Sequence, residues 1–345
     1  MKKRIEKIIT VLKSNPLLSS SEIYENLGLD ISYPTLKRDL VHLLAQGHVV
    51  VSGQGKASRY SISPAYHLLV NIDLDDYFSK ETDERAINYN YNFSLSEEIL
   101  PANNLFTDEE LQKLYTFQNQ FKTNISTLSV SAYRKEMERL AIDLSWKSSQ
   151  IEGNTYSLLE TERLLREKET AAGKTKDEAV MLLNHKEAID FILENPDYLV
   201  PLSLSKIEDI HSILVKELDI DRNIRVRRVG ITGTNYRPLD NEFQIKEELN
   251  RVCQIINSKR NVFEQAFLAL IMISYIQPFN DGNKRTARIV SNAILLANDY
   301  CPISFRTVDS IDYKKAMLLF YEQNNISGFK KIFIEQFGFA VNTYF

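Results

Sequence analysis

A polar loop between two strongly apolar stretches constrains the fold of this chain more than any other feature of its sequence. Residues 262–275 are almost entirely apolar, and residues 286–297 form a second apolar stretch. Both patterns are long enough for helices that must be buried, so we expect a mainly α-helical body built around them. The residues between them are polar and end at a predicted helix N-terminus. Unpaired backbone N–H groups and the positive end of the helix dipole converge there, which is the layout of an anion-binding site.

The side chains of this loop suit a phosphate chain. Gly282 lets the backbone approach a phosphate closely. Arg285 and Arg288 are three residues apart, so they project from the same side of the first helical turn and can clamp phosphate oxygens. Asp281 is placed to hold Mg²⁺ between phosphate groups. The loop therefore predicts a polyphosphate site with a magnesium ion.

Residues 277–288 resemble the active-site loop of the Fic family, His-x-Phe-x-Asp/Glu-Gly-Asn-Gly/Lys-Arg-x-x-Arg, at every specified position except the first. The resemblance implies a helical domain that binds ATP and transfers AMP, or less often another phosphate-containing group, to a hydroxyl of a target protein. It makes Asp281 the Mg²⁺ ligand and Phe279 the buried anchor of the loop. The nucleotide-binding positions that it implies are Gly282, Asn283, Lys284, Arg285 and Arg288.

Gln277 stands at the position where the family has its catalytic histidine. An amide does not accept a proton near neutral pH, and loss of a positioned base costs about 100- to 10,000-fold in rate. Two alternatives stay open: an adenylyltransferase weakened at this position, and a catalytically inactive nucleotide-sensing transcriptional regulator. Lys284 is similar to the death-on-curing toxins, so a phosphotransferase is a third alternative. We interpret His211 as a packing residue and not as a replacement base.

A helix predicted over about residues 133–153 carries a second motif. Its apolar face ends in the sequence Ser148-Ser-Gln-Ile-Glu152-Gly153, which resembles the Fic inhibitory motif, Ser/Thr-x-x-x-Glu-Gly/Asn. Ser148 and Glu152 are one helical turn apart. A carboxylate presented to Arg288 would form a charge-assisted pair where a γ-phosphate needs to bind. We therefore expect the protein to be self-inhibited.

Residues 228–238 form a third candidate element. They alternate apolar and polar residues at their start and contain two glycines and a proline, which predicts a small β-hairpin. The hairpin resembles the flap on which Fic proteins lay an extended target segment by strand addition. The clamp residues implied are Gly233, Thr234, Asn235 and Tyr236.

Residues 1–64 predict a separate module of three short helices and a β-hairpin. The first helix ends before Pro16, the second starts with the capping box Ser19-x-x-Glu22, and the third precedes Gly47. Two extended runs, residues 49–51 and 60–62, follow them. This order resembles the winged-helix family, which implies DNA binding, although a protein-interaction or dimerisation role stays open. The candidate DNA contacts are Tyr33, Thr35, Lys37, Arg38 and His42 on the third helix, and Lys56 and Arg59 in the wing.

Charge supports this division of the chain. The net charge is −4, and residues 1–65 contain nine Lys and Arg against five Asp and Glu, so this part carries +4 and the rest −8. Phosphate binding needs local positive charge, so any DNA contact is expected in the N-terminal module. Residues 65–106 read as an irregular connector, and residues 107–345 as the Fic domain.

The remaining expectations concern the surroundings of the protein. No run of about 18 apolar residues occurs, so we expect no membrane span and a cytoplasmic location. Cys253 and Cys301 are interpreted as two buried thiols, and no structural metal is expected. The expected partners are a target protein and DNA, and a homodimer stays an open alternative.

Overall fold

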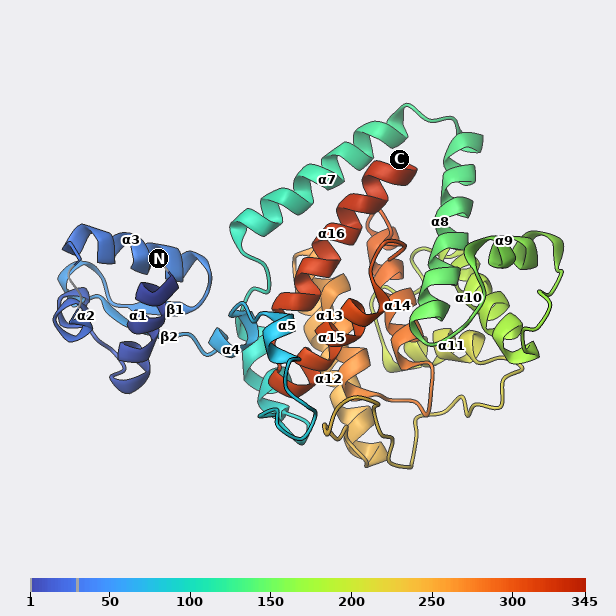
Figure 1. Cartoon of the computed structure of the whole chain (residues 1–345). Helices are drawn as coiled ribbons and strands as arrows, with labels where there is room; N and C mark the ends of the chain where they lie inside the picture. The colour runs from blue at the N-terminus through green and yellow to red at the C-terminus, as the bar shows by residue number, and fades with distance from the viewer. Residues whose placement is uncertain (1, 29–30) are drawn as a thin grey trace.

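The computed structural model describes residues 2–28 and 31–345 (Figure 1). It begins with three helices, α1 (Lys2–Ser14), α2 (Ser20–Leu27) and α3 (Tyr33–Ala45). Strands β1 (Val49–Ser52) and β2 (Arg59–Ile62) follow and pair antiparallel, with Val49 opposite Ile62. A 3-10 turn, η1 (Gly55–Ala57), lies between them. We call these elements the head; they stand apart from the rest of the chain in Figure 1.

Local signals explain the helices of the head. Ser19 caps α2, and the side chain of Glu22 bonds back to the backbone N–H of Ser19, so the predicted capping box is present. Gly28 ends the helix in the left-handed conformation, with φ 54°. Arg4 on α1 forms a two-pronged ion pair with the buried Asp39 of α3. The head has its own apolar cluster, which includes Ile8, Leu12, Ile23, Leu36, Leu40, Leu43 and Val49.

The connector, residues 65–106, wraps onto the body and does not hang free. It contains α4 (Tyr66–Leu69), α5 (Leu74–Tyr77), a π-helical turn η2 (Leu95–Ile99) and α6 (Leu100–Ala102). The Asn325 side chain donates to the backbone oxygens of His67 and Val70, at 2.8 and 2.7 Å. The connector therefore belongs to the same packed unit as the last two helices of the chain.

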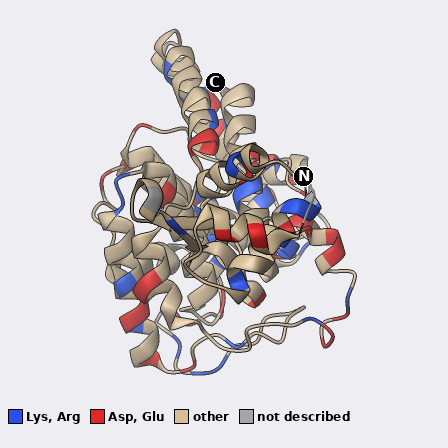
Figure 2. Ribbon diagram, turned by 90° about the vertical axis from the view of Figure 1, so that its left-hand side faces the viewer, with Lys and Arg blue, Asp and Glu red and all other residues tan. Residues whose placement is uncertain are grey.

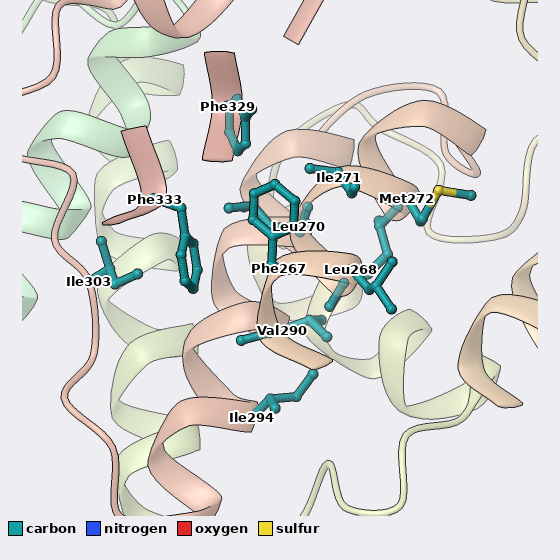
Figure 3. Packing of buried hydrophobic residues seen from close by; sticks show 14 of the residues in the cluster. Phe267, Leu268, Leu270, Ile271, Met272, Val290, Ile294, Ile303, Phe329 and Phe333 are labelled. Carbon is teal, nitrogen blue, oxygen red and sulfur yellow. The ribbon is translucent and has the colours of Figure 1, made fainter. Parts of the chain in front are cut away.

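The body is helical, as the sequence predicts, and α13 (Val262–Ile276) lies at its centre. Figure 3 shows Phe267 and Leu270 of α13 among Val290 and Ile294 of α14 and Phe333 of α16. Every residue of α13 from Ala266 to Ile276 is buried, which accounts for its continuous apolar sequence. The other body helices are α7 (Asp108–Ser126), α8 (Val130–Ile151), α9 (Leu158–Glu167), α10 (Lys176–Glu194), α11 (Leu204–Leu214), α12 (Glu242–Ser258), α14 (Asn283–Ala297), α15 (Ser310–Gln323) and α16 (Ser327–Tyr344).

The prediction of a β-hairpin over residues 228–238 is wrong. Within residues 2–28 and 31–345 the one sheet is the pair of β1 and β2, and residues 228–238 form an irregular loop with a turn at Thr232 and Gly233. The flanks of this loop find partners elsewhere: the Arg237 N–H bonds to the Tyr89 oxygen at 2.8 Å, and Asn90 and Arg237 form an isolated bridge. The alternating pattern is too short to outweigh these contacts with the connector.

Two further expectations can be compared with the structure. Cys253 and Cys301 are both buried free thiols, as predicted. Among the helices of the described residues, none is long and apolar enough to span a bilayer.

Candidate nucleotide site

The floor of the candidate site is the loop between α13 and α14. Helix α13 ends where Gln277 enters the left-handed conformation, with φ 52°. Helix α14 begins after Gly282, whose φ of 80° is one that glycine adopts without strain. The backbone N–H groups of Asn283, Lys284 and Arg285 have no hydrogen-bond partner within the described chain. Three unpaired donors therefore lie at the positive end of a 15-residue helix, and two of their residues, Asn283 and Lys284, line the adjacent cavity.

Side chains hold this floor in place from both sides. Asn283 forms two bonds with Phe279, one to its N–H and one to its carbonyl oxygen, both at 2.8 Å. The Phe279 ring stacks on His211, with the ring centroids 3.6 Å apart. His211 Nε2 lies 3.0 Å from the Asp281 carbonyl oxygen. Phe279 is thus the buried anchor, and His211 is a packing residue, as expected from the sequence.

Two buried arginines project from α14 with unused donors. Arg285 is 1% exposed, and its one described partner is the Asp281 carboxylate at 3.2 Å. Its Nε and Nη1 groups, and Nη1 of Arg288, have no hydrogen-bond partner among the described residues. Buried polar groups in proteins are nearly always paired. These free donors therefore indicate a site built for an anionic ligand.

Glu152 occupies the approach to these donors. Its Oε1 accepts from Arg288 Nη2 at 2.9 Å, and its Oε2 lies 3.2 Å from Lys284 Nζ. Burial by itself raises the pKa of Glu152, but the charges and hydrogen bonds of Arg288 and Lys284 outweigh it and lower the pKa to about 2. The carboxylate is therefore ionised at neutral pH and pairs with both cations.

Glu152 directly follows helix α8, and Ser148, in the last turn of this helix, also contacts Arg288. Arg288 donates to the Ser148 side chain at 2.8 Å and to its backbone oxygen at 3.0 Å. His185 Nε2 lies 2.7 Å from the same Ser148 hydroxyl. Burial, together with the charges of Arg288 and Arg285, lowers the pKa of His185 well below its usual value. Arg288 donates to the Ser148 oxygen, so the Ser148 hydroxyl is able to donate to Nε2 of the neutral ring, and Ser148 joins His185 to Arg288. Gly153, the last residue of the motif, follows with φ 102° and ends the helix.

Gln277 is 8% exposed, and its amide is already engaged. Its Nε2 donates to the Ser274 carbonyl oxygen at 2.6 Å, and its Oε1 accepts from Asn283 Nδ2 at 3.0 Å. The hydroxyl of Tyr321 lies 3.5 Å from the same Nε2. Through these contacts Gln277 stabilises the shape of the loop, and it also lines the cavity.

Asp281 is the candidate Mg²⁺ ligand of the site. Its side chain is 64% exposed and lies at the cavity, with Oδ2 near Arg285. No group of three or more His, Cys, Asp or Glu side chains able to hold a metal occurs among the described residues. Mg²⁺ is commonly held by one or two carboxylates together with substrate phosphates. Asp281 fits that arrangement, in which the nucleotide supplies the other ligands.

A cavity of about 490 Å³ lies above the floor. Its walls include Glu152, Gln277 and Lys284, and α15 forms one side through Tyr313, Lys314, Met317, Leu318 and Tyr321. Residues 229–233 also line it, and we call residues 226–236 the roof loop. Of the predicted clamp residues, Gly233 lines the cavity. Thr234 bonds to the Tyr236 N–H, the Asn235 amide bonds to Asp83, and the buried Tyr236 donates to the Tyr275 oxygen.

Comparison with known proteins finds relatives of this helical domain. Residues 201–295 match the model of the Fic/DOC family. The chain contains a Fic domain. Curated relatives include Protein adenylyltransferase Fic of Aedes aegypti, which is 28% identical over 190 residues, or 52% of this chain and 37% of that protein. The protein of the same name from Nematostella vectensis is 29% identical over 175 residues, or 49% of this chain and 40% of that protein. The matches thus span less than half of these relatives.

Solved structures share the fold of the Fic domain at low sequence identity. Fic-1 from C. elegans superposes with a TM-score of 0.61 at 20% identity, covering 68% of this chain and 72% of that one. A Fic domain containing signaling protein from Bacteroides thetaiotaomicron gives a TM-score of 0.57 at 19% identity, covering 67% of this chain and 95% of that one. These likenesses establish the fold.

Sequence reasoning missed several residues that support the Fic domain site. His185 lies on α10, which packs against α8 and α14. Arg225 is 1% exposed and donates to the backbone oxygens of Gln277 and Arg227, at 2.6 and 2.9 Å. Tyr321 lines the cavity. None of these residues belongs to a motif, because each reaches the site through packing of distant helices.

The head lies outside the Fic domain match, and its α3 presents an exposed face. Lys37, Arg38 and His42 are exposed, while Leu36 and Leu40 face the core. Other candidate DNA contacts are engaged locally: Tyr33 with Ser20, Thr35 with Ser32 and Arg59 with the Ser58 oxygen. The Lys56 side chain lies outside the described part of the chain. In Figure 2, which shows the molecule from the side of the head, basic and acidic residues are interspersed.

Proposed function

We propose that this chain is a self-inhibited Fic-type adenylyltransferase, which binds ATP and transfers AMP to a hydroxyl of a protein target. One observation carries the proposal: Glu152 pairs with Arg288 at 2.9 Å and with Lys284 at 3.2 Å, beside unpaired donors at the N-terminus of α14. Relatives named protein adenylyltransferase support the type of reaction. Inhibition follows because a γ-phosphate and the Glu152 carboxylate compete for the same guanidinium.

The residues of the floor have separate tasks in this proposal. The N–H groups of α14, Arg285 and Arg288 bind the phosphate chain, and Asn283 keeps the loop in its shape. Asp281 would hold Mg²⁺, which neutralises charge on the phosphates when it is bound. Gln277 orients the floor but accepts no proton, so transfer is slow compared with that of a site that has a base.

A second candidate function is favoured by the same Gln277. Its amide forms hydrogen bonds with Ser274 and Asn283. These bonds hold the loop in shape and provide no group that accepts a proton. A nucleotide-sensing regulator would need a seat for ATP and a DNA-binding head, but no catalytic base. Nucleotide binding is common to both candidates.

Labelled ATP separates the candidates. The protein and its Glu152→Gly variant are incubated with Mg²⁺ and ATP labelled at the α- or the γ-phosphate, alone and with cell lysate. Protein labelled from the α-phosphate supports AMP transfer, and label from the γ-phosphate alone supports phosphotransfer. No label, together with clear ATP binding by calorimetry, supports the sensor. Stronger labelling by Gln277→His would show that the missing base limits the rate.

We also propose that the head is a winged helix that binds DNA through the exposed face of α3. The order of three helices and a two-stranded wing supports this, as do the exposed Lys37 and Arg38. Gel shifts with genomic fragments at stated salt test it. Lys37→Ala and Arg38→Ala should each weaken binding and reduce the salt slope by about one, whereas Lys331→Ala, a control on the body surface with a side chain 76% exposed, should not. Equal binding by all variants would reject α3 as the contact.

A further inference from the structure

The roof loop has little structure of its own. Between Val226 and Tyr236 the described chain shows no backbone-to-backbone hydrogen bond. Residues 229–233 nevertheless line the cavity. Something outside the loop must therefore fix its position.

At the turn of the loop, Arg85 of the connector supplies such a contact. Its Nη2 donates to the Gly233 carbonyl oxygen at 2.6 Å and lies 3.0 Å from Glu322 Oε1. The two charged side chains are only 6% and 0% exposed. The Arg85 guanidinium also lies 4.9 Å from the centroid of the Phe78 ring. A buried arginine thus joins the roof loop to α15. Its two partners, Gly233 and Glu322, lie 148 and 237 residues after it in the sequence.

Gly233 is the turn of the roof, and it is pressed against α15. Its φ is +89°, and a Cβ at this position would lie 3.3 Å from Leu318 Cδ1. Leu318 itself lines the cavity. Arg85 therefore holds the turn where the roof meets the cavity wall.

The connector is itself anchored at Glu322. Tyr77 donates to Glu322 Oε2 at 2.8 Å, and the Asn88 N–H donates to the Glu322 backbone oxygen at 2.8 Å. Asp83 provides a second tether to the roof, accepting from the Asn235 amide at 2.8 Å. Since Tyr321, the neighbour of Glu322, lines the cavity, connector, roof and wall meet at this ion pair.

We infer that Arg85 is a positioning residue for the nucleotide site: by binding the Gly233 oxygen and Glu322 together, it holds the roof loop closed over the phosphate seat. The inference rests on the proposed nucleotide binding. A purely structural ion pair would stabilise the fold without changing how the folded site holds nucleotide. The two roles therefore differ in what a folded variant does.

The test uses the full chain with Glu152→Gly, so that the Glu152 carboxylate no longer pairs with Arg288 and Lys284 at the proposed phosphate site. In this background, Arg85→Met with Glu322→Gln removes both charges and leaves neither buried alone. Asp75→Asn is the matched control, because Asp75 and Lys315 join the same connector to the same helix at the surface, 2.8 Å apart, with Asp75 90% exposed. Binding of Mg·ATP is measured by calorimetry, and amide hydrogen exchange is measured over residues 226–237 without nucleotide.

We expect the double variant to bind Mg·ATP at least about tenfold more weakly and to exchange faster in the roof loop, while Asp75→Asn binds within about twofold of the background. The weaker binding and faster exchange follow because the loop loses a charge-assisted hydrogen bond and has no backbone-to-backbone hydrogen bonds of its own. If the double variant is not folded by circular dichroism, Arg85→Lys, which keeps the charge but carries its nitrogen on a shorter side chain than Nη2 of Arg85, takes its place with the same expectation. A folded variant that binds as tightly as the background, or shows unchanged roof exchange, overturns the inference. Failure of the Glu152→Gly background to bind Mg·ATP would reject the proposed function, and the exchange measurement would still test the role of Arg85.

Discussion

The floor and the roof of the cavity are built in different ways. The floor, residues 277–288, is buried except near Asn280 and Asp281, and it is bonded to itself through Asn283, Phe279 and Gln277. The roof loop is largely exposed, and connector side chains fix it at Gly233 and Asn235. Local sequence therefore determines the floor, while packing of distant segments determines the roof. Substitutions in the floor should accordingly have larger effects than matched substitutions in the roof.

The largest effect is expected for Arg288→Ala. This change removes a partner of Glu152, two bonds to Ser148 and the proposed phosphate contact. Breaking a buried pair costs about 3 kcal/mol of unfolding free energy, to be measured by urea unfolding. In the Glu152→Gly background, affinity for Mg·ATP should fall about 100-fold. Arg163→Ala, a control with an arginine side chain 62% exposed, should change neither; unchanged ATP affinity in Arg288→Ala would contradict the account of the floor.

A pair of glycines compares floor and roof directly. Gly282→Ala places a Cβ at a φ of +80°, 3.4 Å from the His211 ring, whereas a Cβ on Gly230 meets nothing within 4 Å. We expect Gly282→Ala to lower the unfolding free energy by about 1–2 kcal/mol, and Gly230→Ala to change it by less than about 0.5 kcal/mol. Urea unfolding of both variants measures this. Equal losses would show that the roof is as constrained as the floor.

A smaller effect is expected at the edge of the seat, where Lys284 meets Glu152. These side chains are 23% and 19% exposed, so solvent weakens their pairing. A double-mutant cycle with Lys284→Met and Glu152→Gln should give a coupling free energy of about 1 kcal/mol or less. A coupling well above that of Arg288 with Glu152 would make Lys284 the main partner.

The smallest effect concerns pH. Because the pKa of Glu152 is lowered from 4.5 to about 2, its pairing is fully present above pH 4.5 and is lost only as the pH falls through the lowered value. Calorimetry on the unmodified protein should therefore find no gain of ATP affinity, from this residue, between pH 8 and about pH 5. A marked gain on acidification in that range, absent in Glu152→Gln, would contradict the ionised state of the carboxylate.

The sequence predicted what depends on near neighbours in the chain. The capping box at Ser19, the turn at Gly282 and the two helices around the floor follow from local residue types, and all are present. The approach of Glu152 to Arg288 was expected from two short motifs and a family resemblance. The roles of the individual site residues stay predictions.

What the sequence did not predict depends on packing between distant helices. The roof was expected to be a hairpin, because its alternation looks like a strand, yet Tyr89 and Arg85 of the connector take its bonds. His185 gave no local signal, since its role arises from α10 lying against α8. Hydrophobic periodicity predicts helices, and motifs predict functional loops. Neither predicts which distant residues will contact a segment that has no regular structure.

The central claim is that Glu152 closes the phosphate seat. Calorimetric titration of Mg·ATP into the unmodified protein and into Glu152→Gln tests it most directly, because glutamine keeps the shape of the side chain and removes its charge. We predict that the variant binds roughly tenfold more tightly or better. Equal affinity in both proteins, with both folded, would contradict the claim.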